Sequence, residues 1–458
     1  MTMQKTILPM AAAFMLAAAA PVLSTAARAT PVISKDATLP VGSELNAELL
    51  NQPTELFSME MAGGKRSYLF NLGDMLFSSS AIFGGKARDA GMSCNSCHQQ
   101  GASNPKLFVP GMSKKPGTFD TSGPFFNAKA DNGVFDPVTT PSLRGAKYLA
   151  PYGHDGRIAS LREFVRNVIV NEFAGAEPSG QVLDALVTYV NEISFLPNGK
   201  ITSDGKLTAK APDAARRGEA VFNKPFRHDA TMSCATCHVA NAAFVDRKVH
   251  DIGSGGFFKT KTLLNARFNA PYFHDGRYDT LDEVVAHFDS HFDLGLSQAE
   301  RSDLVAYLDS VGDADRPFTP NTVAAEIDEL ADFASVLDVA IPARDAEVIR
   351  LTVDSVGAEW REVAEKFPDQ KNTSIDGGLA ERLKARAAVR DMVLALRRIA
   401  MAAQAGDFAE ATSIYAEYKQ TVAAVTPYLR TAEPWSLYNP AVHERHFTAL
   451  RRLAELAK

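Results

Sequence analysis

Two short cysteine motifs constrain what this chain can fold into more than any other feature of its sequence. The chain has four cysteines, and they form two pairs with identical spacing, Cys94 with Cys97 and Cys234 with Cys237. A histidine follows each pair at once, so the local sequences read MSCNSCH and MSCATCH. The pattern C-x-x-C-H is the attachment signature of c-type haem. We therefore expect a chain organised around two covalently bound haems.

The residue types suit this chemistry. Two thiols add to the two vinyl groups of one porphyrin, and the adjacent histidine places its imidazole on the iron. His98 and His238 are accordingly the predicted proximal ligands. Two disulfides are the alternative use of four cysteines in an exported chain. The duplicated motif argues against that alternative, and a thioredoxin-like dithiol would need a βαβ context that the sequence lacks.

A second repeat surrounds the motif His-Asp-Gly-Arg. Residues 140–168 and 260–288 share 13 of 29 positions at an offset of 120, including Ala-Pro-Tyr before each motif. Each copy ends in apolar residues spaced by three and four, which predicts a helix. The sequence therefore predicts two related haem domains, 50–200 and 205–318. The second cysteine lies 57 residues before the motif histidine in the first copy and 37 in the second, so the first copy carries a loop insertion.

The two ends of the chain differ from this repeat. Residues 321–458 contain no cysteine, and their apolar residues recur at helical spacing, which predicts a bundle of about four helices. Residues 1–29 have a charged start, an alanine-rich apolar run and the ending Ala27-Arg28-Ala29, which together predict a cleaved signal peptide. A membrane anchor is less favoured because the run is shorter than the ~20 residues needed to span. The expected class is mainly α, exported and without stable membrane insertion, and the net charge of -6 implies no nucleic-acid partner.

Two C-x-x-C-H domains with Pro-Tyr-x-His-Asp-Gly repeats resemble the bacterial di-haem cytochrome c peroxidase family, which includes the MauG-type protein-oxidising enzymes. The resemblance covers about 50–318, and His250 to Gly276 looks especially typical. It implies two cytochrome c-like domains with two haem c groups, the first peroxidatic and the second transferring electrons. The implied activity is periplasmic reduction of hydrogen peroxide with electrons from a small redox protein. Oxidation of a protein side chain and plain electron transfer are the alternatives.

The resemblance also suggests catalytic residues. The family's distal acid lies some twenty residues after the first Asp-Gly-Arg, where Glu172 is the nearest carboxylate after a two-residue slip. Such an acid moves a proton between the two oxygens of peroxide; a surface carboxylate is the alternative. His154 and Arg157, like His274 and Arg277 in the second copy, would lie at a haem edge or contact propionates, or else would only stabilise the turn.

Three departures from the family pattern affect the irons. No histidine lies between His98 and His154, so the first iron is expected to have an open coordination position opposite His98. Met112 is the alternative ligand for that position. His154 stands where the family has an interhaem Trp, which the BthA-like branch also lacks. Electron relay through Tyr152, through His154 or directly between the haems stays open. The third departure is Phe288, which occupies the usual ligand position of the second iron.

Phenylalanine cannot ligate iron, but two histidines flank it. His287 is the predicted ligand of the second iron, with His291 as the alternative, and both could instead face solvent or pair with aspartates. A histidine in place of methionine would lower the potential of the second haem. The resemblance also implies an interdomain calcium near Thr139, Asn269 and Pro271, where the usual residues are changed. The extension could cap the haem domains, dock a partner or build a homodimer.

Overall fold

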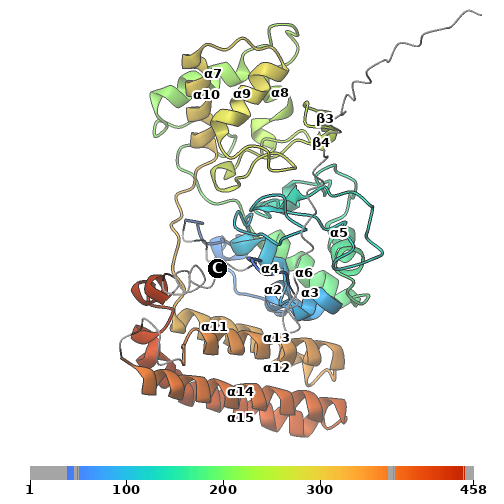
Figure 1. Ribbon diagram of the computed structural model, residues 1–458, viewed down its shortest axis with the longest axis vertical. Coiled ribbons are helices and arrows are strands. Elements are labelled where there is room, and N and C mark those ends of the chain that lie inside the picture. The colour runs from blue at the N-terminus through green and yellow to red at the C-terminus, as the bar shows by residue number, and fades with distance from the viewer. Residues whose placement is uncertain are drawn as a thin grey trace, which may run out of the picture.

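The computed structural model describes residues 39–45, 49, 51–369, 375, 377–446 and 448, so the predicted signal peptide lies outside the described residues. The described chain is mainly helical, which confirms the predicted class. It forms three layers, with the second haem-binding half above, the first half in the middle and the C-terminal helices below (Figure 1). The domain boundaries given above stay a prediction.

The first half is built on a few helices and long loops. Its elements are α1 (Ser58–Met61), α2 (Tyr68–Ser78), η1 (Ser80–Ile82), α3 (Gly85–Asp89), α4 (Cys94–Cys97), η2 (Gln99–Gly101), η3 (Ala146–Tyr148), α5 (Leu161–Asn167), η4 (Val168–Glu172) and α6 (Gly180–Glu192). The predicted loop insertion contains the antiparallel pair β1 (Thr118–Phe119) and β2 (Val138–Thr139), with Thr118 opposite Thr139.

The second half repeats this order with shorter loops. Its elements are α7 (Asp213–Asn223), α8 (Cys234–Cys237), η5 (Ala240–Ala242), β3 (Val249–Asp251), β4 (Phe257–Lys259), η6 (Ala266–Phe268), α9 (Leu281–His291) and α10 (Gln298–Val311). The strands β3 and β4 pair antiparallel, with Val249 opposite Lys259.

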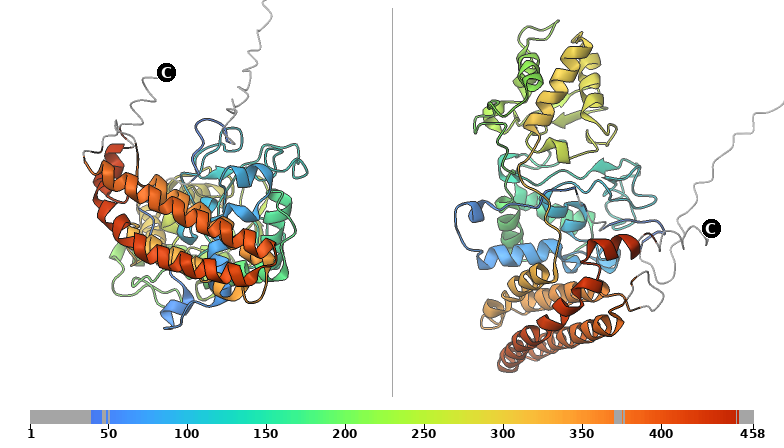
Figure 2. Two further views of the ribbon diagram at one scale, coloured as in Figure 1. Left: turned by 90° about the horizontal axis from the view of Figure 1, so that it is seen from below. Right: turned by 90° about the vertical axis from the view of Figure 1, so that its left-hand side faces the viewer.

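The C-terminal residues add a helical layer. It consists of α11 (Val323–Ala334), α12 (Leu337–Ala340), α13 (Ala346–Glu365), α14 (Leu379–Gln404), α15 (Phe408–Ala432) and η7 (Glu433–Trp435). The two longest helices, α14 and α15, lie side by side on the outside of the molecule (Figure 2). A tight turn at Gly406, which has a φ of 79°, joins them.

Each haem-binding half is held by one close helix crossing. Gly73 on α2 faces α6, and a Cβ there would lie 2.1 Å from the carbonyl oxygen of Ala185. Gly218 on α7 faces α10, where a Cβ would lie 1.9 Å from the carbonyl oxygen of Asp303. Only glycine allows backbones to approach so closely. The two crossings are therefore equivalent, and each depends on one glycine.

An aromatic pair stands beside each crossing. Phe77 packs on Tyr189 with ring centroids 4.9 Å apart, and Phe222 packs on Tyr307 at 4.8 Å, both at 46°. The phenylalanine lies four residues after the crossing glycine in both halves, so one helical turn supplies both features. These pairs extend the repeat beyond the residues that the sequence comparison found.

The two halves contact each other by an exchange of backbone hydrogen bonds. Thr139 N–H donates to the carbonyl oxygen of His274 at 2.7 Å, and Lys259 N–H donates to the carbonyl oxygen of His154 at 2.8 Å. Thr139 and Lys259 end β2 and β4 and are themselves 120 residues apart, the offset of the sequence repeat. The two halves therefore meet through equivalent residues about a pseudo-twofold axis.

The described C-terminal helices share their apolar core with the first half. The core of the first half is continuous with that of α11–α15, whereas the second half has a separate core. Polar contacts mark the junction: Ser79 and Ser355 are 2.6 Å apart through their hydroxyls, and Asn71 Nδ2 donates to Ser335 Oγ at 3.2 Å. Within the described part of the chain, no helix is both long and apolar enough to cross a bilayer.

Candidate functional site

The two cysteine pairs lie on matching short helices that begin with the same cap. Ser93 precedes α4 and exchanges hydrogen bonds with Ser96, and Ser233 precedes α8 and does the same with Thr236. Such reciprocal caps satisfy the free N–H groups of a helix start. The single turn holds its two cysteines three residues apart, on one face. The repeated serine of MSCNSCH and MSCATCH is therefore explained by the turn that presents both thiols.

All four cysteines are free thiols in the structure. Burial raises the pKa of Cys94 and of Cys97 to about 12 and that of Cys234 to about 11. Thiols with a raised pKa stay protonated at neutral pH and react poorly as free nucleophiles. These thiols therefore differ from the exposed, reactive cysteines of a redox dithiol, and their burial is compatible with a role in cofactor attachment.

The histidines after each pair are oriented by backbone carbonyl groups. His98 Nδ1 lies 2.8 Å from the Pro141 carbonyl oxygen, and His238 Nδ1 lies 3.1 Å from that of Phe244. Because a carbonyl oxygen only accepts, Nδ1 carries the proton, and Nε2 keeps the lone pair that a metal needs. Burial lowers the pKa of His98 to about 4, so its ring is neutral at physiological pH. Both side chains are prepared to ligate iron.

The surroundings of the first pair also suit a haem. Cys94 and Cys97 lie against the apolar core of the first half. The buried guanidinium of Arg144, three residues after Pro141, has two nitrogens, Nε and Nη1, with no hydrogen-bond partner in the described chain. Its Nη2 donates to the Pro53 carbonyl oxygen at 2.8 Å, and the charge of Glu55 acts on the guanidinium. Nε and Nη1 are left to donate to a further acceptor, and a buried donor without one is costly. A haem carboxylate is such an acceptor, so the residues present fit the cofactor that the motif implies.

Glu172 lies at the end of an unusual helical turn. Helix α5 continues into the π-helical turn η4, and Glu172 is its last residue. The side chain is only 15% exposed, and Asn167 Nδ2 donates to its carboxylate at 3.2 Å. Arg157 lies 3.7 Å from the same oxygen. The sequence-predicted Glu172 and Arg157 therefore meet in one partly buried site.

This carboxyl group is near the first attachment motif. Burial raises the pKa of Cys97, and the charges of Cys94 and Glu172 raise it further, so Glu172 is close enough to Cys97 to interact with it electrostatically. Burial raises the pKa of Glu172 above its usual 4.5, although Arg157, Thr121 and Asn167 act in the opposite direction. A carboxyl group with a raised pKa keeps its proton to a higher pH than an exposed one, which suits a group that has to hold and transfer a proton.

The two Asp-Gly-Arg turns differ in what their arginines reach. Arg157 pairs with Asp155 at 3.1 Å and extends to Glu172. Arg277 pairs with Asp275 at 2.8 Å and donates to the carbonyl oxygen of Ser254 at 2.7 Å. The arginine of the first half is thus shared with the candidate acid, whereas that of the second half stabilises a loop.

The motif histidines lie at the contact between the halves. His154 Nε2 donates to the Thr139 carbonyl oxygen at 2.8 Å, and burial lowers its pKa well below 6.5. His274 stacks on Phe258 with ring centroids 3.6 Å apart. The Nδ1 atoms of both rings are buried and have no hydrogen-bond partner in the described chain. His154 is therefore a neutral ring between the two halves, the position from which a relay was predicted.

His287, the predicted ligand of the second iron, has both ring nitrogens engaged. Its Nε2 donates to the Ile252 carbonyl oxygen at 2.7 Å, and its Nδ1 accepts from Tyr278 Oη at 2.9 Å. Its ring is parallel to that of His291 at 5.8 Å, and Phe288 follows it in the same aromatic group. Ligation by His287 would have to replace one of these hydrogen bonds, so the choice between His287 and His291 stays a prediction.

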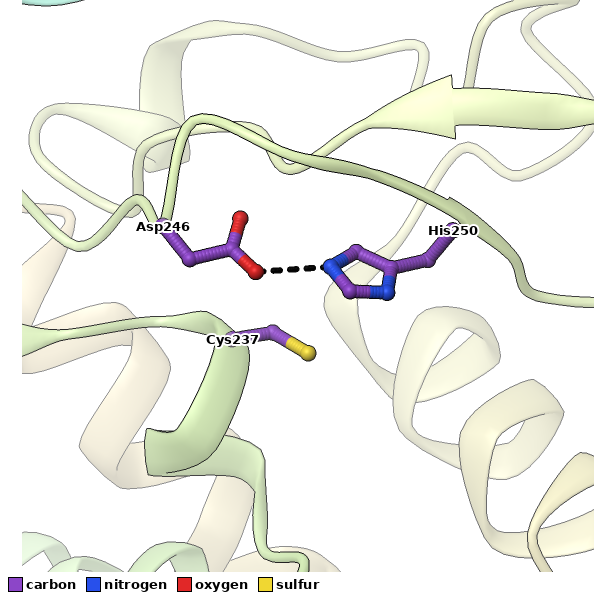
Figure 3. A group of neighbouring side chains, drawn as sticks. All are labelled: Cys237, Asp246 and His250. Carbon is purple, nitrogen blue, oxygen red and sulfur yellow. Dashed lines mark hydrogen bonds and ion pairs between the residues drawn. The ribbon is translucent and has the colours of Figure 1, made fainter.

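A group with metal-ligand side chains lies beside the second attachment motif (Figure 3). The ligand atoms of Cys237, Asp246 and His250 lie within 4.8 Å of one another, and His250 Nε2 donates to the Asp246 carboxylate at 2.7 Å. Thr260 Oγ1 donates to the other carboxylate oxygen at 2.7 Å. Because Cys237 belongs to the C-x-x-C-H motif, we interpret the group as part of the haem-attachment site.

The residues named for calcium lie at the contact between the halves. Asn269 Oδ1 is buried without a hydrogen-bond partner in the described chain, which suits an oxygen ligand of calcium. The Thr139 hydroxyl already donates to the Phe273 carbonyl oxygen at 3.0 Å. Met112, the alternative ligand of the first iron, is buried in the core of the first half.

Sequence reasoning missed the partners of Glu172. Asn167 and Thr121 both lie beside the carboxylate. Asn167 is five residues before Glu172, a spacing that brings side chains together only across a π-helical turn, and Thr121 lies in the inserted loop. The signal in the sequence was the length of that insertion, which brings extra polar residues to the first half alone.

The comparisons with known proteins agree with this geometry. A family model described as di-haem cytochrome c peroxidase matches residues 213–319. Hydrazine synthase subunit gamma from Kuenenia stuttgartiensis is 26% identical over 239 residues, covering 39% of this chain and 65% of that protein. Methylamine utilization protein MauG from Methylorubrum extorquens is 30% identical over 177 residues, covering 31% and 47%. The cytochrome-c peroxidase IdrP2 from Pseudomonas sp. is 34% identical over 132 residues, covering 24% and 33%.

The relatives thus include proteins named MauG and cytochrome-c peroxidase, and this chain carries two attachment motifs of the c-type haem pattern. Residues 213–319 match the family of di-haem cytochrome c peroxidases, and the relatives named MauG and cytochrome-c peroxidase support the superfamily resemblance read from the motifs. The family implies haem c cofactors. The matches span between 33% and 65% of the lengths of the three relatives above.

Two solved structures are similar over much of the chain. Hydrazine synthase from Kuenenia stuttgartiensis, studied under xenon pressure, has a TM-score of 0.40 at 22% identity and covers 61% of this chain and 99% of that chain. A MauG-like protein associated with microbial copper homeostasis has a TM-score of 0.37 at 16% identity, with coverages of 58% and 95%.

Proposed function

We propose that this chain is an exported, periplasmic di-haem enzyme that reduces hydrogen peroxide to water at its first half. Electrons come from a small periplasmic redox protein through the second half. When bound, haem supplies the iron that activates peroxide and the redox chemistry. The single observation that carries the proposal is Glu172, a partly buried carboxyl group with a raised pKa beside the first attachment motif.

The protein's own part is to hold and move a proton. The Glu172 carboxylate accepts the proton of one peroxide oxygen and returns it to the other, so that water can leave. Asn167 orients the carboxylate, and the Arg157 guanidinium keeps a fraction of it ionised despite burial. Because the pKa lies above 4.5, turnover should fall as the pH is lowered through that raised value.

The test is peroxide-dependent oxidation of a reduced donor by the protein with both haems attached. Glu172→Gln keeps the shape and removes the proton carrier, and we expect kcat/KM for peroxide to fall by about 10²- to 10⁴-fold. Glu163→Gln, an exposed position on α5, is the matched control and should change the rate little. A fully loaded protein that does not react with peroxide, or full activity in Glu172→Gln, would show the proposal to be wrong.

Peroxide-dependent oxidation of a protein side chain, as the name MauG suggests for a relative, is the second candidate. The observation in its favour is Phe288 at the usual ligand position of the second iron, with His287 and His291 beside it. A histidine ligand would lower the second potential and make that haem a poorer acceptor from ordinary cytochromes.

Electron paramagnetic resonance of the resting ferric protein separates these functions from plain electron transfer. One high-spin and one low-spin signal would mean that one iron is open for chemistry, as both catalytic proposals require. Two low-spin signals would favour a carrier cytochrome. His287→Ala should abolish the low-spin signal if His287 is the second ligand and should leave it unchanged if His291 is.

A further inference from the structure

A cavity of about 410 Å³ lies where the C-terminal helices meet the first half, and neither attachment motif lines it. One wall is Ser79 to Ala81, at the end of α2 and in η1. The opposite wall is formed by α13 and α14. A pocket of this size fits a small-molecule ligand.

Three arginines line this cavity against one carboxylate. Arg88 comes from α3, Arg361 from α13 and Arg397 from α14, whereas Asp354 is the one acidic lining residue. Asp354 is already paired with Arg350, outside the cavity, at 3.3 Å. Within residues 51–369 and 377–446, no ion pair joins Arg361 or Arg397 to a carboxylate. Arg88 pairs with Asp89 at 3.4 Å, so Arg361 and Arg397 are the two cavity arginines whose charge is left without an ion pair in the described chain.

The floor of the cavity is open because of a glycine. Gly357 lies in the interior of α13, where glycine destabilises a helix relative to alanine. A Cβ at this position would have one atom within 4 Å, Nη1 of Arg361, at 3.9 Å. The guanidinium of Arg361 therefore lies over Gly357. Helix α13 is therefore less stable than it would be with alanine at this position, where a side chain would enter the cavity.

We propose that this cavity binds a small anion that carries phosphate or carboxylate groups, with Arg361 and Arg397 as its main contacts and Arg88 as the third. The planar guanidinium group donates two parallel hydrogen bonds to phosphate or carboxylate oxygens, and three such groups around one cavity select a multiply charged ligand. Gly357 leaves the room that the ligand occupies.

The bound anion would link the two parts of the molecule. Arg88 lies in the last turn of the short helix α3 and is six residues before Cys94, whereas Arg361 and Arg397 belong to the C-terminal helices. An anion between them satisfies charges from both sides at once. This site gives the extension a binding role that is separate from the chemistry at the haems.

The experiment is calorimetric titration of the protein with both haems attached, using pyrophosphate and citrate as separate probes at constant ionic strength. We expect saturable binding of at least one probe. Arg361→Gln and Arg397→Gln should each weaken it by about 10- to 100-fold, the loss of a charge-assisted contact. Arg390→Gln, two turns earlier on α14 and outside the cavity, is the matched control and should leave binding unchanged.

Gly357→Leu tests the same cavity without changing charge. It should abolish binding while the haem absorption spectrum and the thermal unfolding of the helices are retained. Preference for pyrophosphate would assign the site to phosphate compounds, and preference for citrate would assign it to polycarboxylates. No saturable binding of either probe, or equal weakening by Arg390→Gln, would overturn the proposal, as would tight binding in both Arg361→Gln and Arg397→Gln.

Discussion

The two haem-binding halves share a framework but differ in one helical turn. Both have a capped attachment turn, and both have a crossing glycine with its aromatic pair. After the His-Asp-Gly-Arg turn, however, α5 of the first half passes into the π-helical turn that ends at Glu172. Helix α9 of the second half stays regular to His291, and the position equivalent to Glu172 is Phe292. The residues that the two halves share form the same framework. The halves differ where the helix after the Asp-Gly-Arg turn becomes π-helical in the first half and stays regular in the second.

The surroundings of that turn differ accordingly. In the first half the turn places a carboxylate between Asn167 and Arg157, in a polar site. In the second half the same region is an aromatic group of Phe273, His287 and Phe288. A polar site suits proton transfer, whereas an aromatic group excludes water and suits electron transfer. This difference is the one that our proposal requires, with catalysis in the first half and electron transfer in the second.

The largest expected effect comes from removing one attachment pair. In the variant Cys234→Ser with Cys237→Ser, haem content should fall from two per chain to one, because each pair serves its own half and the two cores are separate. Pyridine haemochrome absorbance and intact mass measure the number. Cys94→Ser with Cys97→Ser is the matched variant. A chain that keeps two covalent haems would contradict the assignment of one haem to each motif.

The two crossing glycines should be equally sensitive to substitution by alanine. Gly73→Ala and Gly218→Ala each place a methyl group within about 2 Å of a carbonyl oxygen. Overpacking of this kind lowers the free energy of unfolding by about 1–3 kcal/mol. Denaturant unfolding followed by haem absorbance measures both variants.

Gly357→Ala is the control for this pair, because the space around it is open. It should raise the free energy of unfolding by about 0.5–1 kcal/mol, the helix preference for alanine. If one crossing variant were destabilised and the other unaffected, the two crossings would not be equivalent, and the shared framework would have to be reconsidered.

A smaller effect concerns the contact between the halves. Lys259 Nζ donates to the carbonyl oxygens of Leu149 and Pro151 at 2.6 and 2.5 Å, and burial lowers its pKa from 10.5 to about 8. Thr139, its counterpart, does not titrate. Between pH 8 and 10.5 the unfolded chain binds more protons than the folded one, so the free energy of unfolding should rise with pH in this window.

Lys259→Met should reduce that rise and also lose the two hydrogen bonds; the part of the rise that remains comes from Lys261, whose pKa burial lowers to about 7. Urea unfolding at several pH values, compared between the variant and the unchanged protein, measures the difference. Lys248→Met, an exposed position on the same hairpin region, serves as the control and should keep the rise. An unchanged pH dependence in Lys259→Met would mean that another group titrates at this contact.

Much of the framework could be predicted from the sequence because its signals are local. The cysteines, the following histidine and the preceding serine all act within one helical turn, so their spacing alone specifies the attachment turn. The crossing glycines were missed for a simple reason. Gly73 and Gly218 are 145 residues apart, whereas the other repeat has an offset of 120, because the first half has 20 more residues between its cysteine pair and its motif histidine and five more between its crossing glycine and its first cysteine.

The rest depends on contacts that no local pattern records. The π-helical turn before Glu172 has no proline or glycine to announce it, and tertiary packing determines it. The C-terminal helices were predicted as helices, but their docking on the first half depends on pairs such as Ser79 with Ser355, which are 276 residues apart. Such long-range pairs become visible only in the folded chain.

The exchanged backbone bonds between the halves have a consequence for how the chain is built. A contact in which residue i meets j and the equivalent j meets i is the form of a symmetric homodimer. Here Thr139 reaches the His274 carbonyl and Lys259 reaches the His154 carbonyl within one polypeptide. Each half supplies the strand end that completes its neighbour's turn. The two halves thus meet as the subunits of a symmetric homodimer do, although they belong to one chain. Either half produced alone would expose the surface through which it contacts the related half.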